Sequence, residues 1–259
     1  MPEELTKRTS APRIGSRSVA AFPAVYAVKQ FVNLFCRNLS TFARARRIGR
    51  MGDLRERLIN AYGEGEPVLA EDVLRLYPGI SRQAVYKKID AAIGAGELER
   101  YGRGVYYVPR RTRLGKARPS AESVLRRRWL VDADGNAVGY VTGAALANEA
   151  GLTEQVPAVV EVATNAESTR VREVAGFGGW RKVVLRRPRT EVDDGNVDAL
   201  RFLDLITAEP VMALGDAAIA ALGRLAEKAG RSKIYECAAA YPAKTSKRLV
   251  ECEVRNVFA

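Results

Sequence analysis

A short stretch of polar and basic residues has the chemistry needed to bind a nucleic acid duplex. Arg82 and Gln83 can form paired hydrogen bonds with guanine and adenine edges, and the alanines among them permit close approach to bases. Lys87 and Lys88 suit phosphate oxygens. Tyr86 can equally contact the DNA backbone or pack against the protein. These residue types on one helix predict a surface that faces DNA.

A second group of basic residues follows shortly afterwards. Arg100 and Arg103 flank a loop with two glycines, and Arg110 and Arg111 extend the positive charge along the chain. Contacts from such side chains to phosphates position a protein on a duplex without reading its sequence. The predicted DNA-binding residues are therefore Arg82, Gln83, Tyr86, Lys87, Lys88, Arg100, Arg103, Arg110 and Arg111.

Residues 51–113 contain the elements that must position these side chains. Apolar periodicity predicts three helices, the third capped by Ser81 and closed by Gly96, followed by two short strands around the glycine loop. The third helix has one apolar stripe, formed by Val85, Ile89, Ala92 and Ile93. We therefore predict a winged helix-turn-helix over residues 51–113. Winged helices also act as protein-interaction modules, which is the alternative interpretation.

The charge distribution favours a polyanionic partner for one part of the chain. Of 259 residues, 42 are Lys or Arg and 30 are Asp or Glu, a formal charge of +12. Residues 1–50 carry 10 basic and 2 acidic side chains, residues 51–120 carry 13 and 9, and residues 121–259 carry 19 of each. The excess is therefore confined to the first 120 residues, where we expect the DNA to bind.

The sequence contains few of the residue combinations that form catalytic or metal-binding sites. The chain has no histidine, which excludes His-based triads and metal sites, and its three cysteines form no metal-binding motif. Asp132 and Asp134 lie in an Asp-Gly turn, where a structural role is the expected one. Glu161 and Glu173 with Lys182 leave a degenerate nuclease-like core as an open alternative. We predict no enzymatic activity and no cofactor.

The remainder of the chain predicts a second domain. A basic linker over residues 114–120 leads to residues 121–259, where grouped strands at about 157–163, 169–175 and 180–186 precede grouped helices. The fold class is therefore α+β, with a winged helix-turn-helix followed by a mixed α+β domain. The absence of a long apolar run and of a secretory signal pattern predicts a cytoplasmic protein without membrane contact.

Residues 1–50 form a basic extension with three interpretations. Residues 1–20 have a disordered composition, whereas residues 23–47 repeat apolar side chains at helical spacing. The helical stretch is open to interpretation as a membrane-surface helix or a DNA-contacting arm, and the orderly pattern that starts at Met51 leaves an over-extended reading frame as the third interpretation. The intact mass of the protein from its native host tests the third.

A more distinctive run lies in the second domain. It reads Tyr-Val-Thr-Gly-Ala-Ala-Leu-Ala-Asn over residues 140–148, then Gly-Leu-Thr-Glu-Gln-Val-Pro over 151–157, and reaches Asn165. Together with the preceding winged helix, it resembles the AbiEi-like antitoxins of type IV toxin–antitoxin systems. The resemblance covers about residues 51–258. It implies a bacterial antitoxin that opposes a nucleotidyltransferase-like toxin and represses its own operon by binding promoter DNA.

Two other functions stay open at the level of the sequence. One is a stand-alone winged-helix transcription regulator whose second domain senses a ligand or mediates assembly. The other is a DNA-processing enzyme that uses Glu161 or Glu173. In the 140–165 run itself, we expect structural roles, with Gly143 allowing close packing and Asn148, Thr153 and Gln155 satisfying backbone groups.

Overall fold

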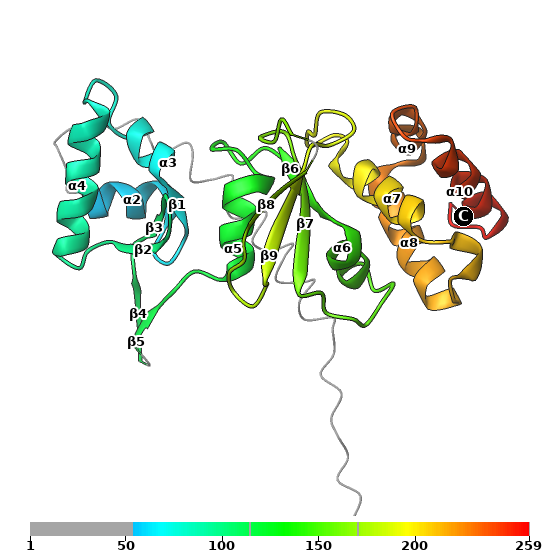
Figure 1. The fold of residues 1–259 in the computed structure, drawn as a ribbon, viewed down its shortest axis with the longest axis horizontal. Helices are drawn as coiled ribbons and strands as arrows, with labels where there is room; N and C mark the ends of the chain where they lie inside the picture. Colours follow the sequence, from blue (N-terminus) through cyan, green and yellow to red (C-terminus); the bar gives the residue numbers. More distant parts are fainter. Residues whose placement is uncertain (1–53, 114, 170, 259) are drawn as a thin grey trace, which may run out of the picture. The chain divides into compact units, whose positions relative to one another are not determined.

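The computed structural model describes residues 54–113, 115–169 and 171–258, and these residues form a mixed α+β structure (Figure 1). The predictions made for residues 1–50 and for Met51 lie outside the described residues. Residues 51–259 form one compact unit, which comprises a helical group with a small sheet, a four-stranded sheet with its helices, and a terminal group of helices.

The first group combines three helices with a three-stranded sheet of order β1-β3-β2. Its elements are α2 (Leu54–Tyr62), β1 (Val68–Leu69), α3 (Ala70–Arg75), α4 (Arg82–Gly94), β2 (Glu99–Gly102) and β3 (Val105–Tyr107). The helices enclose one apolar core, in which Leu58, Val73, Val85 and Ile89 are completely buried. The predicted order of helices and strands is therefore confirmed for these residues.

A second hairpin follows where the sequence pattern predicted a linker. Strand β4 (Arg110–Thr112) pairs antiparallel with β5 (Gly115–Ala117). Residues 115–117 of the predicted linker therefore form a strand that the sequence pattern did not predict. The two strands are almost fully exposed, so they lack the apolar alternation that identifies a half-buried strand in a sequence. Backbone hydrogen bonds between the strands define the hairpin instead.

The second group is built on a four-stranded sheet of order β6-β7-β9-β8, in which β7 and β9 are parallel. Its elements are α5 (Ala121–Leu125), the π-helical turn η2 (Arg126–Leu130), β6 (Gly139–Thr142), α6 (Gly143–Glu149), β7 (Val159–Thr164), β8 (Val171–Ala175) and β9 (Lys182–Arg186). Leu125 and Trp129 cover one face of the sheet, and Leu146 of α6 packs with Tyr140 on the other (Figure 1).

The chain ends in a group of helices that pack on the face of the four-stranded sheet covered by α6. They are α7 (Val197–Ala208), the short η3 (Val211–Ala213), α8 (Asp216–Ala229), α9 (Arg231–Ala238) and α10 (Ala243–Val254). Helix α7 is central, because Leu200, Phe202, Leu203 and Ile206 are completely buried on it. Among the helices of the described ranges, none is both long and apolar enough to cross a membrane.

The distinctive run at residues 140–165 has structural roles. Tyr140 and Thr142 both donate hydrogen bonds to one carboxylate oxygen of Asp204 on α7, at 3.0 and 2.6 Å, and Tyr241 donates to the other oxygen at 2.8 Å. Burial raises the pKa of the Tyr140 and Tyr241 hydroxyls far above the usual range, so both remain donors. This network ties the edge strand β6 to the terminal helices.

The following turn is fixed in the same way. The side-chain amide of Asn148 donates to the carbonyl of Thr153 at 3.1 Å, and the backbone N–H of Gln155 donates to the Thr153 hydroxyl at 3.2 Å. Gly143 has φ +66°, and a Cβ there would lie 3.0 Å from the Glu161 carboxyl carbon, so glycine is favoured at this strand-to-helix junction. The structural roles expected for Asn148 and Thr153 are confirmed, whereas Gly143 is explained by its backbone conformation and not by helix packing.

Candidate nucleic-acid interface

Helix α4 has the two faces that its sequence predicts. Ser81 caps its first turn by accepting a hydrogen bond from the Ala84 N–H at 3.3 Å, which leaves Arg82 as the first helical residue. Val85, Ile89 and Ala92 are buried, and Ile93 packs partly against the same core. The exposed side chains on the other side are Arg82, Gln83, Lys87, Asp90 and Ala91, and the Asp90 carboxylate is paired with Arg100 at 3.8 Å. This polar side of α4 is available to a ligand along its whole length.

Tyr86 lies at the boundary between these two faces. Its ring is half-buried and packs against the core, and the Arg82 guanidinium lies over it at 5.9 Å from the ring centroid. The structure thus favours packing for Tyr86, one of the two roles left open by the sequence. The contact with the Tyr86 ring restrains the Arg82 guanidinium at the start of α4. A restrained guanidinium is favourable for a bidentate contact with a base edge, because less side-chain freedom is lost on binding.

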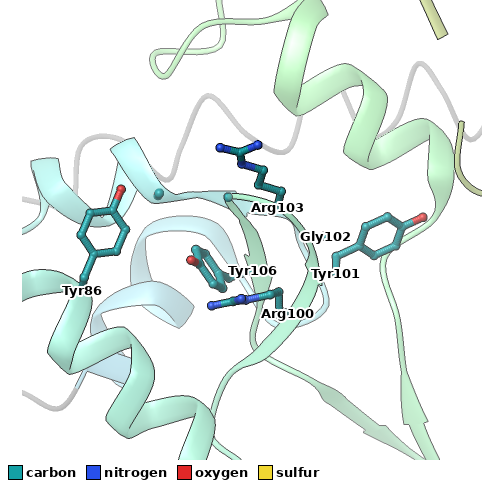
Figure 2. Close-up of a pocket in the computed structure, with 8 residues that line it drawn as sticks. Tyr86, Arg100, Tyr101, Gly102, Arg103 and Tyr106 are labelled. Atoms are coloured by element: carbon teal, nitrogen blue, oxygen red, sulfur yellow. The ribbon is translucent and has the colours of Figure 1, made fainter. Parts of the chain in front are cut away.

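A shallow hollow of about 550 Å³ joins α4 to the loop between β2 and β3. Figure 2 shows Tyr86 entering from α4 and Arg100, Arg103 and Tyr106 from the β2–β3 hairpin, whereas Tyr101 points to the opposite side. The Arg103 side chain is exposed and makes no hydrogen bond, ion pair or ring contact with another described residue. The hollow is therefore lined by cations and aromatic rings that a phosphate chain can approach.

Besides Arg82, two more of the predicted cations have partners within the protein. One Nη atom of Arg100 lies 3.8 Å from an Asp90 carboxylate oxygen, and its guanidinium lies 5.6 Å from the centroid of the Tyr106 ring. The Lys88 ammonium lies 5.7 Å from the centroid of the Tyr77 ring. Lys88 therefore turns toward its own domain, and Lys87 is the better placed of the two lysines for a phosphate.

Arg110 and Arg111 are exposed but lie apart from the hollow. Both belong to β4, which follows the C-terminal end of β3. The loop with Arg103 instead precedes the N-terminal end of β3. The structure therefore brings Arg82, Arg100 and Arg103 into one region and leaves the β4 pair on a separate hairpin.

No family model, curated protein or solved structure matches this chain. Its function is therefore inferred from the described residues, their contacts and their charges.

The candidate nuclease residues are occupied by ion pairs. Glu161 pairs with Arg186 at 2.6 Å and Glu173 pairs with Lys182 at 2.7 Å. Both glutamates are in register with Val184 on opposite sides of β9, which places their Cα atoms about 10 Å apart, two strand spacings. Within the described ranges, no group of three acidic or cysteine side chains is arranged to hold a metal ion.

Asp132 has a structural role in its turn. Its carboxylate accepts hydrogen bonds from the backbone N–H groups of Asp134 and Asn136 at 2.8 and 2.9 Å, and from the Asn136 side chain at 3.0 Å. The oxygens of Asp132 are thus engaged in closing the turn, as expected for an Asp-Gly sequence.

The sequence pattern did not predict the directions of two tyrosines in the β2–β3 hairpin. Tyr106 is paired in register with Arg100 and contributes its ring to the hollow. Tyr101 turns to the other side of the hairpin, where its ring meets Phe177 edge-on at 6.1 Å. Both tyrosines lie in short strands, and alternation of side chains was the one signal that could have separated their directions.

Proposed function

We propose that residues 54–113 form a winged helix-turn-helix that binds double-stranded DNA, with α4 in the major groove and the β2–β3 loop as the wing. The observation that carries this proposal is the exposed polar side of α4 next to the Arg103 loop. An α-helix fits the major groove of B-DNA, and a basic hairpin beside it can contact the flanking backbone.

Each exposed side chain then has a role that follows from its chemistry. Arg82 and Gln83, in the first turn of α4, contact base edges, because a recognition helix meets the groove with its N-terminal residues. Lys87 and Arg103 neutralise phosphates, which adds affinity at every sequence. The residues that read sequence and those that supply affinity are therefore separate.

The alternative of a protein-binding module is less well supported. Protein interfaces are centred on buried aromatic or aliphatic anchors. The exposed side of α4 instead presents Arg82, Gln83, Lys87, Asp90 and Ala91, with no large apolar side chain among them. Arg100 pairs with the one carboxylate on this side, Asp90, so Arg82 and Lys87 leave the surface with a net positive charge that suits a polyanion.

The salt dependence of binding tests this proposal. If about six phosphates are neutralised, a plot of log K against log salt for duplex DNA from upstream of the gene is expected to have a slope near −5. Fluorescence anisotropy with the full chain measures it. A slope shallower than about −2 would contradict a phosphate-gripping interface of this size.

We further propose that the chain acts as the antitoxin of a bacterial type IV toxin–antitoxin system, which neutralises a nucleotidyltransferase-like toxin and represses its own operon. The support is the resemblance of the 140–165 run and its position after a DNA-binding domain. The run has structural roles here, so the resemblance concerns the architecture of the second domain. A stand-alone transcription regulator is the alternative.

Co-expression distinguishes the antitoxin from a stand-alone regulator. Expression of a neighbouring nucleotidyltransferase gene is expected to arrest growth, and expression of this chain is expected to relieve the arrest. The control is the full chain with Arg82→Ala/Lys87→Ala, which is expected to relieve the arrest as well, because it leaves the second domain unchanged. Continued arrest in the presence of the full chain would reject the antitoxin function and leave DNA binding untouched.

A further inference from the structure

The β4–β5 hairpin has no evident role in the packing of the protein. All three residues of β4 are exposed, as are Gly115 and Lys116 of β5. A two-stranded hairpin without a buried face is marginally stable by itself. Its base is held by the Lys116–Glu99 ion pair at 2.8 Å and by the Arg118 guanidinium, 5.9 Å from the centroid of the Tyr101 ring.

The charge of this hairpin is unbalanced. Seven arginines and lysines and no acidic residue lie between Glu99 and Glu122. The side chains of Arg110, Arg111 and Arg113 are exposed and make no hydrogen bond, ion pair or ring contact with another described residue. The basic hairpin therefore presents positive charge that the fold does not compensate.

The register places two cations opposite each other. Arg111 faces Lys116 across the two strands, and the Lys116 ammonium is paired with Glu99 at 2.8 Å. Arg111 is therefore the cation of this pair that has no counter-charge among the described residues. Arginine also outnumbers lysine here, and its planar fork matches the geometry of phosphate.

The position of the hairpin separates it from the α4 interface. The N–H of Ala70 at the start of α3 donates to the carbonyl of Gly104, so the β2–β3 loop lies beside α3. From there β3 and β4 run in succession to the turn after Arg113, and Figure 1 shows the β4–β5 hairpin extending away from α3. Nine residues of extended chain span at most about 30 Å, close to one turn of duplex at about 34 Å.

Building on the proposed function, we propose that the β4–β5 hairpin is a second contact for double-stranded DNA, which binds phosphates outside the segment that α4 reads. Among the described residues 110–113 and 115–118, the exposed side chains are five cations and one threonine, which suit the phosphates of a duplex. A two-stranded ribbon is narrow enough to follow a groove or its phosphate edge.

Anisotropy with duplexes of two lengths tests this contact. The variant Arg110→Gln/Arg111→Gln/Arg113→Gln is expected to bind a duplex of about 36 base pairs about tenfold more weakly than the unmodified chain and with a salt slope about 2 to 3 units shallower. On a duplex of about 12 base pairs, which spans little more than one turn, we expect a change below about twofold. Circular dichroism melting of the full chain checks that the variant folds.

The matched control is Arg181→Gln/Arg187→Gln/Arg224→Gln, which removes the same charge from exposed arginines elsewhere. Equal behaviour of the hairpin and control variants at both lengths would overturn the inference, as would an equal loss on short and long duplexes. The variant Arg82→Ala/Lys87→Ala separates the two proposals. If it binds both duplexes normally while the hairpin variant loses the long one, α4 recognition fails and the hairpin contact stands.

Discussion

The variant Arg82→Ala/Lys87→Ala is expected to bind its promoter DNA about 100-fold more weakly than the unmodified chain. The loss combines one base-edge contact, worth about 1–3 kcal/mol, with one phosphate contact. Both side chains are exposed on α4, so their removal leaves the apolar core intact. Competition anisotropy with promoter DNA and with a scrambled duplex measures the loss and divides it between specific and non-specific binding.

The two substitutions have different signatures when made singly. Arg82→Ala is expected to reduce the preference for promoter over scrambled DNA, whereas Lys87→Ala is expected to weaken both equally and make the salt slope shallower by about 1. The control Arg224→Ala/Lys244→Ala removes the same charge from exposed positions on α8 and α10. Retention of promoter binding by the α4 variant, at the level of this control, would show that α4 does not face DNA.

Replacing Asp72 with alanine is expected to cause the largest loss of stability, about 3–5 kcal/mol of unfolding free energy. Asp72 is completely buried on α3 and accepts hydrogen bonds from the Leu69 N–H at 2.8 Å, from Arg75 at 2.6 Å and from Arg127. Arg127 lies in η2, and its side chain is 13% exposed, so the variant leaves a largely buried guanidinium without its carboxylate.

Urea unfolding followed by tryptophan fluorescence measures this effect, since Trp129 lies close to Arg127 in η2. Asp72→Asn keeps an acceptor for the Leu69 N–H, and we expect it to lose less stability than Asp72→Ala. Asp72→Asn/Arg127→Met removes both charges and is expected to recover most of the loss. The exposed control Glu227→Ala is expected to change stability by no more than about 0.5 kcal/mol. A similar small change for Asp72→Ala would mean that this ion pair contributes little.

The sequence by itself determined the order of the elements in residues 54–113 and the two faces of α4. Helical periodicity placed Val85 and Ile89 inside and Lys87 outside, and Ser81 marked the start of the helix. These features depend on interactions within one or two turns of a helix, which neighbouring residues specify. The location of the charge excess was also evident, because charge is a property of composition.

Only the tertiary structure decided which distant groups meet. Asp72 and Arg127 are 55 positions apart, and Tyr140 and Asp204 are 64 apart. The turn of Lys88 toward Tyr77 and the division of the predicted cations between the hollow and the β4–β5 hairpin also depend on packing. A strand ladder is made by backbone groups that every residue carries, so a polar hairpin exposed on both faces leaves no apolar period in the sequence. For that reason the sequence pattern did not predict the β4–β5 hairpin.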